Sequence, residues 1–142
     1  MSRVAGKLIA AAAGAAGEDS DSEFENVVLL LDGDGSSGDD NNTFTDSSIN
    51  GFTVTETGSV VQGIFSPYGD RWSAYFDGSS YLSVPDSTDF DFGTSDFTWE
   101  AWIRTTVRSG SQEIVGTFNS SSETWGFRVS ATNVQYYVDG PT

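Results

Sequence analysis

The chain has 142 residues, enough for a single domain of ordinary size, and it is rich in glycine and aromatic residues. Its 21 acidic and 6 basic residues give a net charge of −15, which argues against a nucleic acid partner because an acidic surface repels phosphates. The lack of cysteine and histidine excludes disulfides, thiol nucleophiles and histidine-dependent catalytic triads. No apolar run approaches the roughly 18 residues of a membrane-spanning helix, so the sequence predicts no membrane span.

Residues 1–17 differ from the rest because they are small, nearly uncharged and rich in alanine and glycine. Three interpretations compete: a secretory signal with a weak apolar core, a disordered linker, and an arm that docks on another protein. An isolated helix shorter than about 12–15 residues is marginal in water, so a neighbouring molecule would have to order such a segment. We therefore expect an anchoring arm, followed by an acidic linker at residues 18–25. The anchor residues would be Arg3, Val4, Lys7, Leu8 and Ile9.

A continuous apolar run at residues 26–31 predicts a buried strand, and a loop rich in glycine and aspartate follows it. The loop invites a calcium interpretation. Aligned with an EF-hand, however, it has Ser37 in place of the required glycine and Thr43 in place of the bidentate glutamate. A turn is therefore the default interpretation. A looser calcium site would use the carboxylates of Asp32, Asp34, Asp39 and Asp40.

Alternation of polar and apolar residues predicts strands through the rest of the chain. It is clearest at residues 97–104, where Phe97, Trp99 and Ile103 face one side and Trp102 faces the other. Turn signals bracket a short strand at Tyr81–Val84. Further strands are expected at residues 43–46, 51–57, 71–76, 113–118, 124–129 and 133–138, the last three as an antiparallel meander. The pattern predicts an all-β protein, with an antiparallel β-sandwich over residues 26–142.

Six stretches carry a likeness to a known family: VVLLLDG at residues 27–33, TFTDSS at 43–48, SAYFDG at 73–78, YLSVP at 81–85, FDFG at 90–93 and DFTWEAWIR at 96–104. In their order and spacing they resemble the laminin G-like, concanavalin A-like lectin/glucanase superfamily, which implies a jelly-roll fold. The chain also looks like lectin-like domains in structural proteins of tailed phages, particularly marine ones. Its opening, MSRVAGKLIA, is similar to the start of other such virion proteins.

The resemblance also implies that part of the domain is missing. Domains of this superfamily usually continue with several more strands after a segment like residues 136–140, whereas this chain stops at Pro141-Thr142. A half sandwich leaves aromatic faces partly bare, at a cost of several kcal/mol. We therefore expect a sandwich that is incomplete at its C-terminus, either as a fragment of a longer protein or with a partner chain completing the fold.

Because the superfamily contains glucanases, an enzymatic function has to be weighed. Retaining glycoside hydrolysis uses two carboxyl groups about 5–5.5 Å apart, commonly at alternating positions of one strand. Glu100 is the only acid on its predicted strand, and the E-x-D-x-x-E arrangement of such glucanases is missing. We expect a non-enzymatic protein with no catalytic residue and no required cofactor.

The candidate binding residues are aromatic and acidic. Trp102 points away from Trp99, and Tyr137 points away from Tyr136. Trp102 and Tyr137 could therefore each stack on a sugar or fill a second, covered core face. A calcium ion at the rim, as in some relatives, would need clustered carboxylates. The best group for it is Asp77, Asp86, Asp89 and Asp91, although Asx turns explain each of them as well.

These observations lead to two functional hypotheses. The first is a structural component of a phage virion: the arm at residues 1–17 binds other virion proteins, and the sandwich faces outward as a capsid decoration or tail appendage. Several copies are expected, as a homo-oligomer, with a surface glycan of the host as a further partner. The alternative is a secreted or surface glycan-binding module, with or without calcium.

Overall fold

A computed structural model describes residues 2–4, 23–33, 42–63, 72–106, 109–118 and 123–138. In these residues the protein consists of eight β-strands and two 3₁₀-helices, with no α-helix. Both of its sheets are antiparallel, which confirms the all-β prediction. Within the described ranges, no helix has both the length and the hydrophobicity of a membrane span.

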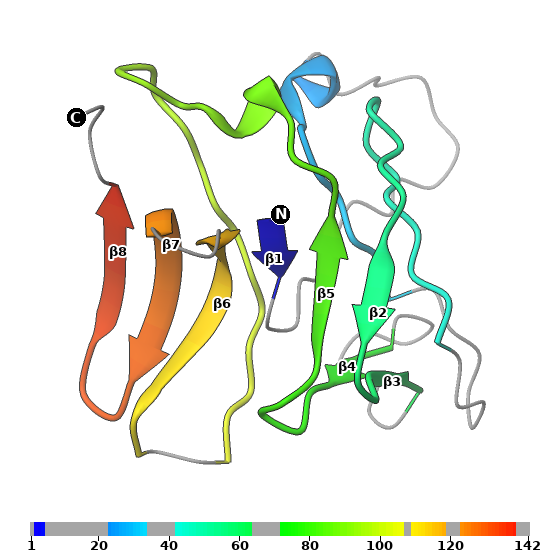
Figure 1. The fold of residues 1–142 in the computed structure, drawn as a ribbon, viewed down its shortest axis with the longest axis vertical. Helices are drawn as coiled ribbons and strands as arrows, with labels where there is room; N and C mark the ends of the chain where they lie inside the picture. Colours follow the sequence, from blue (N-terminus) through cyan, green and yellow to red (C-terminus); the bar gives the residue numbers. More distant parts are fainter. Residues whose placement is uncertain are drawn as a thin grey trace.

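One sheet dominates the structure, with the strand order β2-β5-β1-β6-β7-β8 (Figure 1). Its strands are β1 (Ser2–Val4), β2 (Thr55–Thr57), β5 (Tyr81–Val84), β6 (Ser111–Phe118), β7 (Glu123–Ser130) and β8 (Val134–Val138). The sequence predicted β5 to the residue, and it predicted each end of β6, β7 and β8 to within two residues. These last three strands form the expected meander.

The strand β1 comes from the stretch that the sequence assigned to an anchoring arm. Ser2–Val4 pairs with β5 on one side and with β6 on the other. The backbone of Arg3 and Val4 therefore lies within this chain's own sheet, where the sequence had suggested contact with another protein. The other anchor residues, Lys7, Leu8 and Ile9, lie outside the described residues, and their role stays a prediction.

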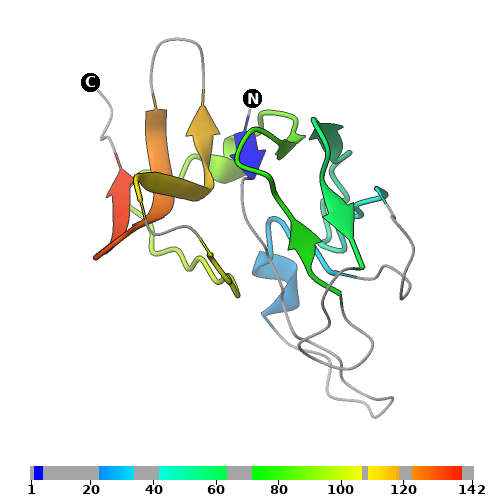
Figure 2. The ribbon, with the colours of Figure 1, turned by 90° about the horizontal axis from the view of Figure 1, so that it is seen from below.

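A second layer covers one face of this sheet (Figure 2). It contains β3 (Val61–Gln62) paired with β4 (Ala74–Tyr75), and the 3₁₀-helices η1 (Phe24–Asn26) and η2 (Thr88–Phe90). The core has two buried groups: Leu31, Val60 and Leu82 in one, and Val84, Phe90 and Trp125 in the other. Both groups pack against the same partly buried side chains, Leu29, Val54 and Val115, so the core is continuous.

Residues 26–31 and 43–46, both predicted as strands, form no strand in the structure. They are joined by an isolated bridge between Leu31 and Asp46, next to which the N–H of Ser47 donates to the carbonyl oxygen of Leu30. The carboxylate of Asp46 holds this region together instead. It is buried and accepts three backbone N–H groups, those of Leu30, Ser48 and Phe52. A buried side chain therefore satisfies donors that a neighbouring strand would otherwise have bonded.

The prediction of a strand at residues 97–104 is wrong, because this segment belongs to no strand in the structure. It runs as a coil over one face of the sheet (Figures 1 and 2), with the rings of Trp99 and Trp125 stacked 5.1 Å apart. The alternation is partly kept, since Trp99 is half-buried and Trp102 is 55% exposed. Phe97 and Ile103, predicted to be in the core, are exposed. Alternation predicts which way a side chain points, but a strand also needs a neighbouring strand, and no described strand pairs with this segment.

The β8 end of the sheet extends beyond the second layer. Three alternate side chains of β8 are exposed there: Val134 at 68%, Tyr136 at 73% and Val138 at 39%. In contrast, Leu82 and Val84 on β5 are buried. The described residues therefore form a sandwich that is closed over β5 and open over β8, in agreement with the expected incomplete jelly roll.

Candidate functional site

The register of the meander assigns its side chains to two faces. Residues opposite each other in an antiparallel pair share a face, and neighbours along a strand lie on opposite faces. Val138 is opposite Trp125, and Tyr137 is opposite Gly126. Since Trp125 belongs to the core, we call its side of the sheet the inner face and the side of Tyr137 the outer face.

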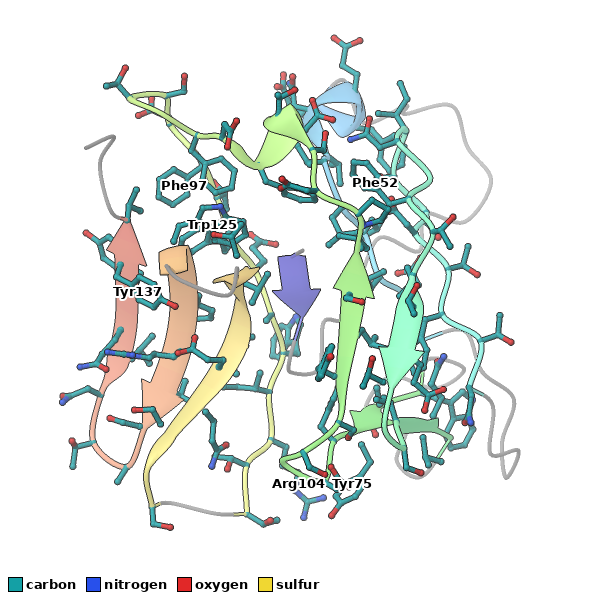
Figure 3. All side chains as sticks on the ribbon, viewed as in Figure 1. Phe52, Tyr75, Phe97, Arg104, Trp125 and Tyr137 are labelled. Atoms are coloured by element: carbon teal, nitrogen blue, oxygen red, sulfur yellow. The ribbon has the colours of Figure 1, made fainter. Side chains whose placement is uncertain are left out.

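Polar side chains surround Tyr137 on the outer face of β8, where Figure 3 labels it. The Nε of Arg128 donates a hydrogen bond to Oε1 of Gln135 at 3.0 Å, and its Nη1 lies 3.6 Å from Oε1 of Glu113. The guanidinium carbon of Arg128 lies 5.2 Å from the centroid of the Tyr137 ring, within the range of a cation–π contact. We call Glu113, Arg128, Gln135 and Tyr137 the Tyr137 cluster.

A glycine makes room for the aromatic ring. A Cβ added at Gly126 would collide with Oη, Cζ and Cε1 of Tyr137, so the ring lies directly over the backbone of β7. Glycine inside a strand weakens the strand, and it often marks a point where another group approaches the backbone closely. Here that group is the ring of Tyr137, which the missing side chain allows to rest on the sheet.

The Tyr137 cluster offers the chemical groups that recognise a sugar. A sugar presents apolar C–H faces together with hydroxyl groups that both donate and accept hydrogen bonds. The guanidinium of Arg128 donates, the carboxylate of Glu113 accepts and the amide of Gln135 does both, while the ring of Tyr137 supplies an apolar surface. Contacts within the cluster hold these groups in position before a ligand arrives, which lowers the entropic cost of binding.

Comparison with known protein families gives a match over the second part of the chain. Residues 76–142 match the family model described as the concanavalin A-like lectin/glucanases superfamily. The matched residues include β5 to β8 and hence the whole Tyr137 cluster. Searches of curated proteins and of solved structures gave no significant match. The matched superfamily includes both lectins and glucanases, so the lack of enzymatic activity stays a prediction. The phage origin also stays a prediction, since the match carries no information on the source of the chain.

The two aromatic residues that the sequence singled out do not share a site. Trp102 also lies within the matched residues, but its segment packs on the inner face through Trp99 and Trp125. Tyr137 lies on the outer face, so the sheet separates the two residues. The exposure of Trp102 also means that it does not fill a second core face, which was one of the two predicted roles.

Three members of the cluster were not found from the sequence: Glu113, Arg128 and Gln135. Arg128 and Gln135 could have been found from the β7–β8 turn. Hydrogen bonds between Ser130 and Asn133 close this turn. A two-residue turn at residues 131–132 places residue 128 opposite 135 and residue 126 opposite 137. The register follows from that turn, and it agrees with the observed pairing.

The four predicted calcium ligands do not converge on one point. Among the described residues, no three acidic side chains lie close enough together to hold a metal ion. Asp86 and Asp91 are exposed, and Asp89 accepts a hydrogen bond from the Ser87 hydroxyl at 2.9 Å. Of the looser loop site only Asp32 is described, while Asp34, Asp39 and Asp40 lie outside the described residues. Calcium dependence therefore stays a prediction.

Asp77 forms the turn that the sequence offered as the alternative to calcium. Its Oδ1 accepts hydrogen bonds from the backbone N–H and the hydroxyl of both Ser79 and Ser80, at 2.8–2.9 Å. These bonds, led by the one from the Ser79 backbone, hold the pKa of Asp77 well below its usual range. The four bonds to Oδ1 give Asp77 a local role in holding this turn.

The lowered pKa of Asp77 leads to a pH-dependent prediction. The ionised carboxylate stabilises the fold above about pH 4, the ordinary pKa of aspartate, and this contribution is lost as pH falls toward the lower pKa of the folded state. Asp77→Asn should therefore be less stable than the wild type at pH 7, and the difference should shrink below about pH 4. Urea unfolding at a series of pH values measures it, and a difference that did not change with pH would refute this role.

A cavity beside Gln62 is too small to be the sugar site. Leu31, Phe44 and Trp72 help to line it, and its volume of about 10 Å³ leaves space for about one water molecule. The amide of Gln62 donates to the carbonyl oxygen of Thr43 at 2.7 Å and so fixes the wall of the cavity. The outer face of the meander is the better place for a larger ligand.

Proposed function

We propose that this protein is a non-catalytic glycan-binding module whose ligand binds the Tyr137 cluster. The observation that carries the proposal is the ring of Tyr137, seated on Gly126 with the guanidinium of Arg128 5.2 Å from its centre. The match of residues 76–142 to a superfamily of lectins and glucanases supports a carbohydrate as the class of ligand.

The charges of the cluster favour a neutral glycan. The carboxylate of Glu113 and the guanidinium of Arg128 are paired, so the cluster itself is close to neutral. The whole chain, however, has a net charge of −15, which repels anionic ligands. A neutral pyranose would stack its C–H face on Tyr137, and its hydroxyl groups would bond to the polar atoms of Arg128, Gln135 and Glu113.

A glycan array with matched variants tests this proposal. The wild type should bind neutral saccharides, and Tyr137→Ala should weaken that binding at least about tenfold, the equivalent of about 1.4 kcal/mol. Tyr137→Phe keeps the ring and should retain most of the affinity. Gly126→Ala should behave like Tyr137→Ala, because the new methyl group displaces the ring.

Trp102→Ala is the control, since it removes an exposed aromatic residue from the opposite side of the sheet. Its affinity should equal that of the wild type. Binding should also survive a chelator, because a calcium ion takes about 6–8 oxygen ligands and the cluster has one carboxylate, that of Glu113. The proposal would be refuted if the wild type bound no saccharide on the array. It would also be refuted if Trp102→Ala lost binding while Tyr137→Ala kept it.

A virion role is a separate proposal, and the sequence alone supports it, through the Ala/Gly-rich arm at residues 1–17 and the likeness to phage structural proteins. It is compatible with glycan binding, since arm and cluster lie at different ends of the chain.

Because Ser2–Val4 forms β1, deleting the whole arm would also disturb the sheet. A variant that tests anchoring without removing β1 changes Leu8 and Ile9 to serine. Virions should then lack the protein although it still folds, and unchanged incorporation would rule out anchoring through these residues.

A further inference from the structure

An asparagine followed by a glycine, at residues 50–51, gives the chain a reactive pair. Asparagine cyclises when the backbone nitrogen of the next residue attacks its side-chain carbonyl carbon. Glycine permits this attack best, because it has no side chain in the way and its backbone is the least restricted. Asn50 is the only asparagine of the sequence that a glycine follows. Asn26 and Asn133 are each followed by a valine, whose branched side chain hinders the same reaction.

The structure leaves this pair open to the reaction. Asn50 and Gly51 are both exposed, at a turn that precedes β2. Gly51 has a φ of 55°, in the left-handed region, and a Cβ built on it would meet no atom within 4 Å. The carboxamide of Asn50 lies at the surface, where its Nδ2 donates to the carbonyl oxygen of Val28 at 3.1 Å. The turn therefore has space in which the Gly51 nitrogen can approach the side chain before it.

The described residues also contain two Asp-Gly pairs, which undergo the same cyclisation, but their contacts protect both of them. Gly33, after Asp32, is buried against Trp72: its carbonyl oxygen accepts the Trp72 N–H at 2.7 Å, and a Cβ on it would collide with the Trp72 carbonyl oxygen. Asp77, before Gly78, has an ionised carboxylate that accepts four hydrogen bonds, and such a group resists attack by a nitrogen. Of these three pairs, only the one at residues 50–51 is both open and uncharged.

We propose that Asn50 is a site of spontaneous deamidation in the folded protein. The Gly51 nitrogen loses its proton and forms a bond to Cγ of Asn50, and the side-chain nitrogen leaves as ammonia, so that a cyclic succinimide joins the two residues. Water then opens the ring at one of its two carbonyl groups. One opening gives aspartate. The other gives isoaspartate, in which the main chain runs through the former side chain. The net reaction consumes one water and releases one ammonia.

Deamidation acts on the segment that Asp46 holds. A carboxylate at residue 50 has no hydrogen to donate, so the bond to the Val28 carbonyl oxygen is lost and two acceptors face each other. Isoaspartate also adds one atom to the main chain between Ser48 and Phe52, whose N–H groups both bond to the Asp46 carboxylate. Both products add a negative charge to a chain that already has a net charge of −15. We therefore expect the deamidated protein to unfold more easily.

Stability measurements test this consequence. Deamidated protein, separated by ion exchange through its added charge, should have a lower urea midpoint than the unmodified protein. Asn50→Asp should reproduce the part of the loss that comes from the hydrogen bond to Val28. Asn133→Asp is the matched control, because it makes the same charge change at another exposed turn residue, and its midpoint should equal that of the wild type. Equal midpoints for Asn50→Asp and Asn133→Asp would overturn the effect on the Asp46 segment.

Peptide mapping by mass spectrometry tests the site itself, in folded protein stored at neutral pH. The peptide that contains Asn50 should gain the mass difference between OH and NH₂, and this fraction should rise with time. Peptides with Asn26 and Asn133 should stay unchanged. Asn50→Gln should abolish the gain, because glutamine has to close a larger ring and reacts more slowly. The proposal is overturned if Asn50 stays unmodified, or if Asn26 and Asn133 gain mass as fast as Asn50 does.

Storage in guanidinium chloride tests whether the fold selects the site. Unfolding removes the contacts of Gly33 with Trp72 and those of Asp77 with its serine donors, so isoaspartate should then form at Asp32 and Asp77 as well as at residue 50. In the folded protein it should form at residue 50 and not at Asp32 or Asp77. Equal isoaspartate at all three positions of the folded protein would overturn the selection by structure.

Discussion

Replacing Asp46 with alanine should lower the free energy of unfolding by about 3–5 kcal/mol, a large part of the stability of a domain this size. Asp46 is only 6% exposed. Its Oδ1 accepts the N–H groups of Leu30 and Ser48 at 2.9 Å, and its Oδ2 accepts that of Phe52 at 2.8 Å. The alanine variant leaves these donors without their acceptor in a partly buried region, and each such loss costs about 1–3 kcal/mol. Urea unfolding measures the change.

Two further variants sharpen this test. Asp46→Asn should also be destabilising, because its NH₂ group would face a backbone donor in place of an acceptor oxygen. Asp86→Ala removes an exposed carboxylate and should change the stability by less than about 0.5 kcal/mol. If Asp46→Ala were no less stable than Asp86→Ala, the carboxylate would not hold the second layer together.

Trp125→Ala should be destabilising to a similar extent, by about 3–5 kcal/mol, as is typical of a large aromatic residue removed from a core. Trp125 is 5% exposed and joins the sheet to the second layer. Its ring centroid lies 5.0 Å from that of Phe92, 5.1 Å from that of Trp99 and 6.3 Å from that of Phe90. The variant leaves a cavity between the layers where all three contacts are lost.

The control for this prediction is the same substitution at an exposed position. Trp102→Ala should cost less than about 1 kcal/mol, because the side chain is already 55% exposed. Thermal or urea unfolding of the two variants compares them directly. Similar losses in both would mean that the aromatic cluster around Trp125 is not the centre of the core.

The strands that sequence analysis located well have clear turn signals at their ends or a partner that is adjacent in the chain. Tyr81–Val84 lies between turn signals that mark both of its ends. The β6–β8 meander consists of alternating runs joined by short turns, so local pattern and final pairing agree. Sequence reasoning could not foresee that Ser2–Val4 pairs between β5 and β6, because its partners are far away in the chain and its alanine-rich surroundings have no strand pattern.

Residues 97–104 show the opposite outcome. Their alternation correctly indicated that Trp99 packs on the core and that Trp102 points away. Alternation describes the orientation of side chains and carries no information on whether a neighbouring strand is present. The error in assigning a strand here has this physical cause. The ring of Phe97 does lie against Trp99, with the centroids 4.7 Å apart, although its side chain is 38% exposed.

Only part of the Tyr137 cluster could be predicted from the sequence. Tyr137 could be named because an aromatic residue on the face opposite Tyr136 needs an explanation. Gln135 and Arg128 could have been added from the register that the β7–β8 turn imposes. Glu113 was harder to find, because the β6–β7 pairing has two irregularities that the sequence does not reveal, one between residues 113 and 115 and one between residues 116 and 118. The two shifts cancel, and Glu113 therefore lies opposite Arg128.

An NMR titration with a neutral saccharide from the array tests the central claim most directly, because it reports which side chains meet the ligand. The Nε–H signal of Arg128, now bonded to Gln135, should shift with the saccharide concentration, while the indole signal of Trp102 should stay in place. A shifting Trp102 signal with an unchanged Arg128 signal would contradict the assignment of the outer face as the binding site.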